Sequence, residues 1–142
     1  MKAAVLALIL AAAAWAALAQ APALRASAGV YSQAQAERGA ALYARHCARC
    51  HGDALEGTDV AQPLTGQAFL DNWTGQPVAA LVERIRASMP LDDPGALDRP
   101  ASADVAAVVL QANGYKPGPA PLPADLDALQ DLFLDGPAAA AK

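Results

Sequence analysis

Apolar and small residues recur at three- and four-residue steps in three segments of the chain, and this period predicts amphipathic helices. The first expected helix covers residues 32–45 and the second covers residues 77–87. The third begins at Ser102 or Ala103 and ends at Ala112, before an Asn-Gly pair that is typical of a helix C-terminus. The sequence therefore predicts an all-α fold built from three to five short helices.

The first helix carries a glycine on its apolar face. Ser32 is its expected N-cap, and Gln35, three residues later, would complete a capping box. A glycine inside a helix costs roughly 1 kcal/mol relative to alanine, so Gly39 on the buried face indicates a close partner helix. The third helix is the natural partner. The alternative is that Gly39 is merely tolerated.

The other segments are rich in glycine, proline and polar residues and predict connections. Within them, Phe69 and Leu70 are expected core residues, and residues 125–134 are expected to add a turn or two with Leu126, Leu129 and Phe133 docked. We expect the following connections: a loose arm over 21–31, a polar loop after residue 51, a second loop over 91–100, a proline-rich wrap over 116–123 and a frayed end over 138–142.

The N-terminus has the pattern of a secretory signal. Lys2 precedes an apolar run over residues 3–18, and small residues around Ala17 and Ala19 form an A-x-A cleavage site. We predict a signal peptide over 1–19 and a mature chain of 123 residues with no stable membrane span. The alternative is an uncleaved anchor, although the run is short for a span. A mature chain of 123 residues is long enough for one domain.

Charge excludes one class of partner. The formal net charge is −4, and it becomes −5 when Lys2 leaves with the signal. A chain this acidic is not expected to bind nucleic acid.

The two cysteines of the chain lie in Cys47-Ala48-Arg49-Cys50-His51, a C-x-x-C-H motif that predicts covalent attachment of one haem c. Two thiols at this spacing each reach one vinyl group of a porphyrin, and His51 then lies beneath the iron as an axial ligand. Two alternatives remain open. The cysteines could form a redox dithiol, or hold zinc together with His51 and His46.

Three further residues are candidates for the same site. Met89, the one methionine left after signal removal, precedes Pro90 and would supply the second axial ligand; a lone methionine can also be core filler. Pro63 would present its carbonyl to the free ring nitrogen of His51, unless it is only a turn proline. Trp73 could bury its ring and donate its N–H to a haem propionate.

These residues resemble the class I c-type cytochromes, small periplasmic electron carriers, over about residues 32–115. The resemblance implies the cytochrome c fold, a domain at 32–115 between an arm at 20–31 and a tail at 116–142, and a periplasmic location. It also implies Cys47 and Cys50 as thioether anchors, His51 and Met89 as iron ligands, and Pro63 as the carbonyl that accepts from His51. The Met-Pro loop and the segment 113–118 are similar to a subgroup that accepts electrons from quinoprotein dehydrogenases.

The leading functional prediction is a one-electron carrier rather than an enzyme, which passes electrons between a redox protein donor, such as a dehydrogenase, and an acceptor or oxidase. An enzyme or gas sensor with an open sixth iron position is the second class, and Met89 argues against it. A subunit of a larger dehydrogenase or oxidase complex is the third, and the sequence does not decide between it and a free carrier.

Overall fold

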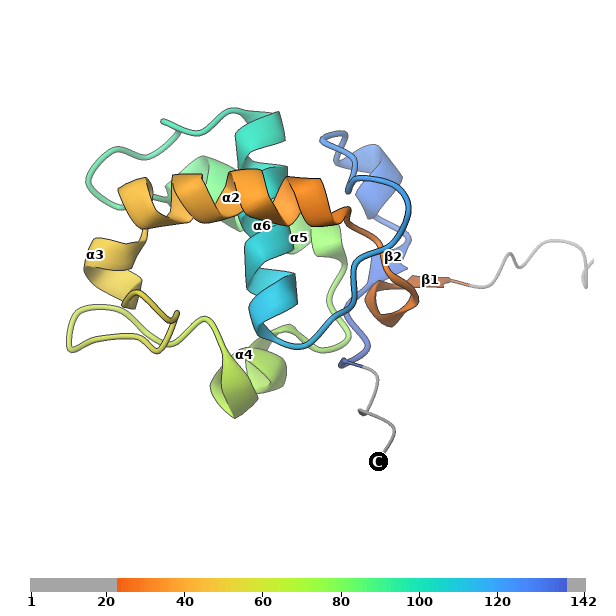
Figure 1. Ribbon diagram of the computed structural model, residues 1–142, viewed down its shortest axis with the longest axis horizontal. Coiled ribbons are helices and arrows are strands. Elements are labelled where there is room, and N and C mark those ends of the chain that lie inside the picture. Colours follow the sequence, from red (N-terminus) through yellow and green to blue (C-terminus); the bar gives the residue numbers. More distant parts are fainter. Residues whose placement is uncertain (1–22, 138–142) are drawn as a thin grey trace, which may run out of the picture.

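A computed structural model describes residues 23–137, and its architecture confirms the all-α prediction (Figure 1). The predicted signal peptide over 1–19 and the frayed end over 138–142 lie outside the described residues. No helix within residues 23–137 is long and apolar enough to cross a membrane. The helices and strands of the described residues, in chain order, are β1 (Leu24–Arg25), η1 (Ala26–Ala28), α2 (Gln33–His46), α3 (Ala48–His51), α4 (Gly66–Trp73), α5 (Val78–Ser88), α6 (Arg99–Ala112), η2 (Asp127–Leu129) and β2 (Leu132–Phe133).

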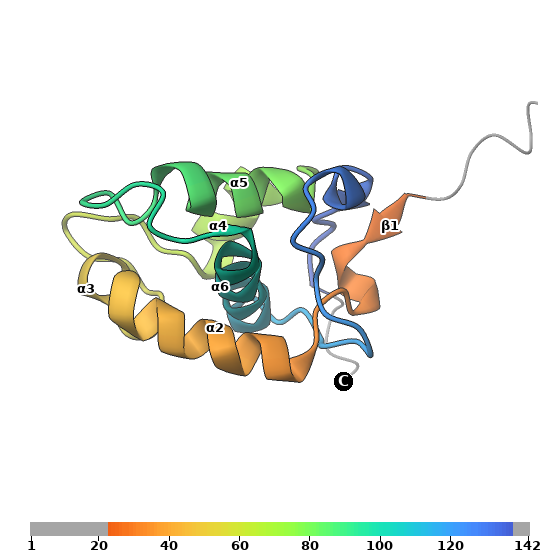
Figure 2. The ribbon, with the colours of Figure 1, turned by 90° about the horizontal axis from the view of Figure 1, so that it is seen from above.

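Helices α2 and α6 cross at close range, as the position of Gly39 predicted (Figures 1 and 2). A Cβ atom at Gly39 would overlap the main-chain carbonyl of Asp104 and lie 2.9 Å from Cγ2 of Val108. Beside this contact, the Arg38 guanidinium donates two hydrogen bonds, of 2.9 and 2.8 Å, to the Asp104 carboxylate. The glycine is therefore required by packing and not merely tolerated.

The start of α2 agrees with the predicted N-cap but not with the predicted capping box. Ser32 caps α2 by accepting from the Gln35 N–H at 3.2 Å, as predicted. Gln35 does not complete a capping box. Its buried amide instead donates to the Leu122 carbonyl at 3.1 Å and accepts from the Leu122 N–H at 2.7 Å, because the C-terminal segment passes over the start of α2.

Two helices differ from the sequence prediction. Helix α6 begins at Arg99, inside the expected loop, because the Asp98 carboxylate accepts from the Ala101 N–H at 2.9 Å and Pro100 suits the first turn. Helix α4 was not predicted as a helix. Its eight residues form little more than two turns, which is too short for a clear period.

The N-terminal arm is not loose over residues 23–31. Leu24 of β1 pairs in parallel with Leu132 of β2, and Ser27 donates its N–H to the Asp135 carboxylate at 3.0 Å. The fully buried Tyr31 donates its hydroxyl to the Tyr115 carbonyl at 2.6 Å. These partners lie more than 80 residues away, so the sequence near the arm contains no periodic signal for them.

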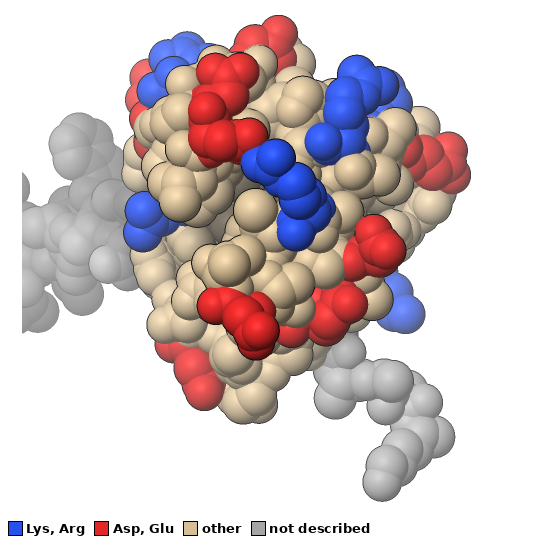
Figure 3. Space-filling model, turned by 90° about the vertical axis from the view of Figure 1, so that its left-hand side faces the viewer, with Lys and Arg blue, Asp and Glu red and all other residues tan. Residues whose placement is uncertain are grey.

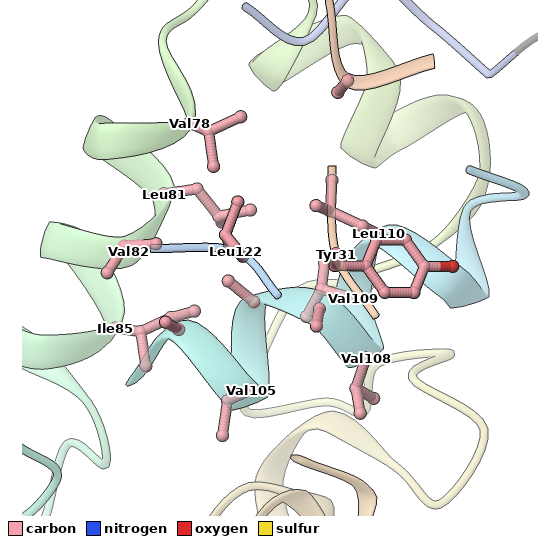
Figure 4. Packing of buried hydrophobic residues seen from close by; sticks show 14 of the residues in the cluster. Tyr31, Val78, Leu81, Val82, Ile85, Val105, Val108, Val109, Leu110 and Leu122 are labelled. Carbon is pink, nitrogen blue, oxygen red and sulfur yellow. The ribbon is translucent and has the colours of Figure 1, made fainter. Parts of the chain in front are cut away.

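A large part of the hydrophobic core is formed by α5 and α6 (Figure 4). The apolar face of α5, which its period predicted, turns toward α6, and the fully buried Leu129 of η2 belongs to the same cluster. Leu122 from the C-terminal segment is also buried there, whereas Leu126 and Phe133 are half-buried. The labelled core residues of the two helices are Val78, Leu81, Val82 and Ile85 in α5 and Val105, Val108, Val109 and Leu110 in α6.

Replacing Gly39 by alanine should destabilise the protein, although helix propensity alone favours alanine by roughly 1 kcal/mol. The new methyl group would have to displace the backbone of α6 at Asp104, and overpacking of this kind costs about 1–3 kcal/mol. Chemical denaturation measures the difference. Ala41→Gly, at an exposed position of α2, is the control for propensity, and a more stable Gly39→Ala protein would contradict the close crossing.

Candidate functional site

A cavity of about 730 Å³ opens beside α3, α4 and the C-terminal end of α5. Its volume lies within the usual range for small-molecule and cofactor sites, about 300–1,000 Å³. The cavity is lined by five of the six predicted site residues, namely Cys47, Cys50, His51, Trp73 and Met89. The structure thus brings together five residues that are spread over 42 positions of the sequence, from Cys47 to Met89.

The two cysteines lie on a single turn of helix. Cys47 ends α2, where its N–H donates to the Tyr43 carbonyl at 2.8 Å, and Cys50 follows in α3 with its N–H donating to the Cys47 carbonyl at 3.0 Å. Burial raises the pKa of the Cys47 thiol to about 11, and the nearby Cys50 adds a smaller effect. Cys47 therefore lacks the lowered pKa of a reactive dithiol cysteine.

The zinc alternative also lacks support. Within residues 23–137, no three His, Cys, Asp or Glu side chains converge in a way that could hold a metal ion. A structural zinc site requires four such donors.

The ring of His51 is oriented by the main chain of the following loop. Its Nδ1 lies 2.9 Å from the carbonyl oxygen of Gln62. A carbonyl can only accept, so Nδ1 is the donor and Nε2 keeps its lone pair free for a metal. The loop itself is fixed to α3, because the Gly57 N–H donates to the His51 carbonyl at 2.8 Å and Thr58 Oγ1 donates to the Cys50 carbonyl at 2.6 Å.

This contact corrects the prediction for Pro63. The acceptor is the carbonyl of the preceding residue, and Pro63 is not among the residues that line the cavity. Proline restricts the backbone of the residue before it, so Pro63 limits the direction of the Gln62 carbonyl instead of offering its own. Pro63 thus marked the right loop, but the carbonyl that accepts from His51 belongs to the residue before it.

A side chain of α2 also supports the turn that carries His51, through a hydrogen bond that the sequence did not predict. The hydroxyl of Tyr43, which is 4% exposed, donates to the Gly52 carbonyl at 2.7 Å. Burial raises the pKa of Tyr43 to about 12, with Cys47, Glu56 and Asp53 adding smaller effects, so the hydroxyl stays protonated and can donate. The period of α2 placed Tyr43 on the buried face but gave no partner for its hydroxyl.

The opposite side of the cavity is formed by α4, α5 and the segment after α5. Met89 is the C-cap residue of α5, its N–H donates to the Ile85 carbonyl at 3.1 Å, and its side chain is half-buried. The half-buried Trp73 stacks on Phe69 with 6.1 Å between the ring centroids. Hydrogen bonding of Trp73 to a propionate remains a prediction.

These residues fit a haem group. Two thiols, an imidazole with a free Nε2 and a thioether all face one cavity of suitable size, and thioether and imidazole are the axial ligand pair of many cytochromes c. A zinc ion or a dithiol would leave Met89 and the large apolar cavity without a role.

Comparisons with known proteins point the same way. Residues 34–109 match the sequence model of the family described as cytochrome C oxidase, cbb3-type, subunit III. No curated protein matches the chain. The crystal structure of the sulfane dehydrogenase SoxCD from Paracoccus pantotrophus is similar, with a TM-score of 0.51 and 23% sequence identity over 70% of this chain and 52% of that one. The chain therefore spans about half the length of that protein chain, and the likeness concerns the fold.

Replacing Tyr43 by phenylalanine should leave the buried Gly52 carbonyl without its donor and destabilise the protein by about 1–3 kcal/mol. Because Gly52 directly follows His51, the absorption spectrum of the holoprotein should also change. Tyr31→Phe is the matched control, since it removes a buried hydroxyl-to-carbonyl bond between residues that do not line the cavity. It should lower stability by a similar amount without altering the spectrum, and equal spectra for the two variants would contradict a role of Tyr43 at the site.

Proposed function

The chain belongs to the family described as cytochrome c oxidase, cbb3-type, subunit III, a family of c-type cytochrome domains, and from this we propose that it is a periplasmic one-electron carrier. Its cofactor would be one haem c, covalently attached through Cys47 and Cys50 and ligated by His51 and Met89. The observation that carries this proposal is the shared cavity, in which the C-x-x-C-H turn and Met89 line the same space from two separate segments.

Each residue has a distinct role in this proposal. Haem iron supplies reversible one-electron exchange between the ferric and ferrous states. Cys47 and Cys50 anchor the porphyrin, and His51 presents Nε2 because the Gln62 carbonyl occupies its other ring nitrogen. Met89 fills the sixth position, favours the ferrous state and leaves no site at which a substrate could bind the metal. This arrangement favours a carrier over an enzyme or a gas sensor.

The location and the partners extend the proposal further. The signal-like residues 1–19 support export to the periplasm, where haem is attached to such motifs. The expected partners are a redox protein donor, with a quinoprotein dehydrogenase as one candidate, and an oxidase or other acceptor. On the face that carries α3, basic and acidic side chains are intermixed, so we expect weak electrostatic steering of the encounter (Figure 3).

A permanent subunit of a larger complex is the second candidate. It is favoured by the family description, which names an oxidase subunit, and by the similar structure, which belongs to a dehydrogenase. Purification from the native periplasm at moderate salt distinguishes the two, because a subunit copurifies in fixed proportion with its complex and a free carrier elutes alone.

Haem should remain attached to the polypeptide after denaturation, because two thioether bonds do not depend on the fold. Denatured protein separated on a gel should show haem-dependent peroxidase staining. A Cys47→Ala, Cys50→Ala double variant, which has no thiol to form a thioether, is the control and should not stain. Complete release of the colour from the parent protein into acidified organic solvent would refute covalent attachment.

Replacing Met89 by alanine should leave the haem attached, lower the reduction potential and open the sixth iron position. Carbon monoxide should then bind the reduced variant readily and the reduced parent hardly at all. Pro94→Ala, in the same loop and at an exposed residue that does not line the cavity, is the matched control and should behave as the parent. Equal uptake by parent and Met89→Ala protein would show that the sixth position is already open and would support the sensor or enzyme alternative.

A further inference from the structure

We propose that the ion pair between Arg49 and Asp92 is a positioning pair that keeps the Met89 loop closed over the cavity. The Met89 loop is defined here as residues 89–97. The proposal rests on the proposed function, because it concerns the residue assigned as the sixth ligand.

The pair joins the two sides of the cavity. Arg49 lies between the two cysteines in α3, and Asp92 lies three residues after Met89. Their side chains meet with 2.6 Å between Nη2 and Oδ2, across 43 residues of sequence. The hydrogen bond from Arg49 lowers the pKa of the Asp92 carboxyl below its ordinary value, so the pair is ionised at neutral pH.

The loop has few other attachments. At its start the Met89 N–H continues the hydrogen bonding of α5, and at its end Leu97 is 4% exposed. Between them, the Asp93 N–H donates to Pro90 and the Ala96 N–H donates to Asp93, so these bonds are internal to the loop. Within residues 23–137, the Arg49–Asp92 bond is the one hydrogen bond that joins residues 90–96 to a segment outside the loop.

The surroundings place this pair at the opening of the cavity. Asp92 lines the large cavity itself. A smaller hollow of about 230 Å³ lies against it, lined by residues from the end of α2, from α3 and from the Met89 loop: Arg45, His46, Arg49, Pro90, Asp92 and Asp93. Separation of Arg49 from Asp92 would therefore join the two spaces and widen the path to the sixth ligand.

Because Arg49 and Asp92 are exposed, their ion pair affects opening of the Met89 loop and not global stability. Arg49 is 72% exposed and Asp92 is 60% exposed, and an ion pair in water contributes little to global stability. Local opening of a loop is governed by the few contacts of that loop, so even a weak contact changes how often the loop opens. We therefore expect an effect on loss of the Met89 ligand and none on global unfolding.

The test uses the ferric holoprotein and imidazole, which binds iron only after Met89 has moved away. Asp92→Asn and Arg49→Gln should each raise the rate of imidazole binding roughly two- to fivefold. The double variant should show the effect of one single variant and not the product of both, since either change breaks the same contact. The midpoint of chemical unfolding should stay at that of the parent.

Glu83→Gln is the matched control, because it breaks an ion pair of the same length, between Glu83 and Arg86 on α5, that does not involve the loop. It should bind imidazole at the parent rate. Exchange of the two charges, Arg49→Asp with Asp92→Arg, should restore slow binding, and this second variant separates the ion pair from any effect of Arg49 on haem attachment.

Parent-like imidazole binding by Asp92→Asn, or multiplied effects in the double variant, would overturn the proposal. Failure of the proposed function looks different. In that case the ferric parent would lack the long-wavelength absorption of methionine-ligated haem, and the reduced parent would take up carbon monoxide, which would overturn both proposals together.

Discussion

The close crossing of α2 and α6 at Gly39 is the contact on which the site depends. Helix α2 ends at the C-x-x-C-H turn, so the distance between α2 and α6 at their crossing sets the position of both cysteines and His51. Arg38 and Asp104 fix the same crossing from the side, with the Asp104 side chain 12% exposed. A glycine in the interior of a helix is an unfavourable choice for the isolated segment, and here the tertiary contact outweighs that local cost.

The two sides of the cavity are held with unequal strength. On the His51 side, Tyr43, Gln62 and Thr58 bind the turn through hydrogen bonds to or from the main chain. Asn113 adds a further constraint from α6, because its side chain donates to the Leu64 carbonyl at 2.8 Å and accepts from the Gly66 N–H at 3.1 Å. The Met89 side has a helix end, a buried Leu97 and one exposed ion pair. The His51 side of the cavity is therefore held by more hydrogen bonds than the Met89 side.

The parts of the fold that sequence reasoning recovered are those encoded by neighbouring residues. The period of α2 and α5, the Ser32 cap and the Asn-Gly end of α6 are all local, and C-x-x-C-H is a complete chemical pattern within five residues. The errors arose where partners lie far apart in the sequence. Gln35 bonds to Leu122 instead of capping its own helix, and the arm is fixed by residues of the C-terminal segment. The Gln62 carbonyl was missed by one residue because a proline constrains its predecessor and not only itself.

The segments outside the family match have a structural consequence for the position of Met89. The Leu134 carbonyl accepts from the Gly75 N–H at 2.6 Å, and the Leu134 N–H donates to the Gln76 carbonyl at 3.0 Å, so the C-terminal segment is bonded to the connection that precedes α5. Helix α5 is thereby fixed at the end opposite Met89, while its face packs on α6. Since an α-helix of eleven residues transmits the position of one end to the other as a rigid rod, the C-terminal segment helps to place Met89 without touching the cavity. The N-terminal arm stabilises that segment in turn through β1 and Ser27, so both ends of the described residues help to hold the Met89 side of the cavity.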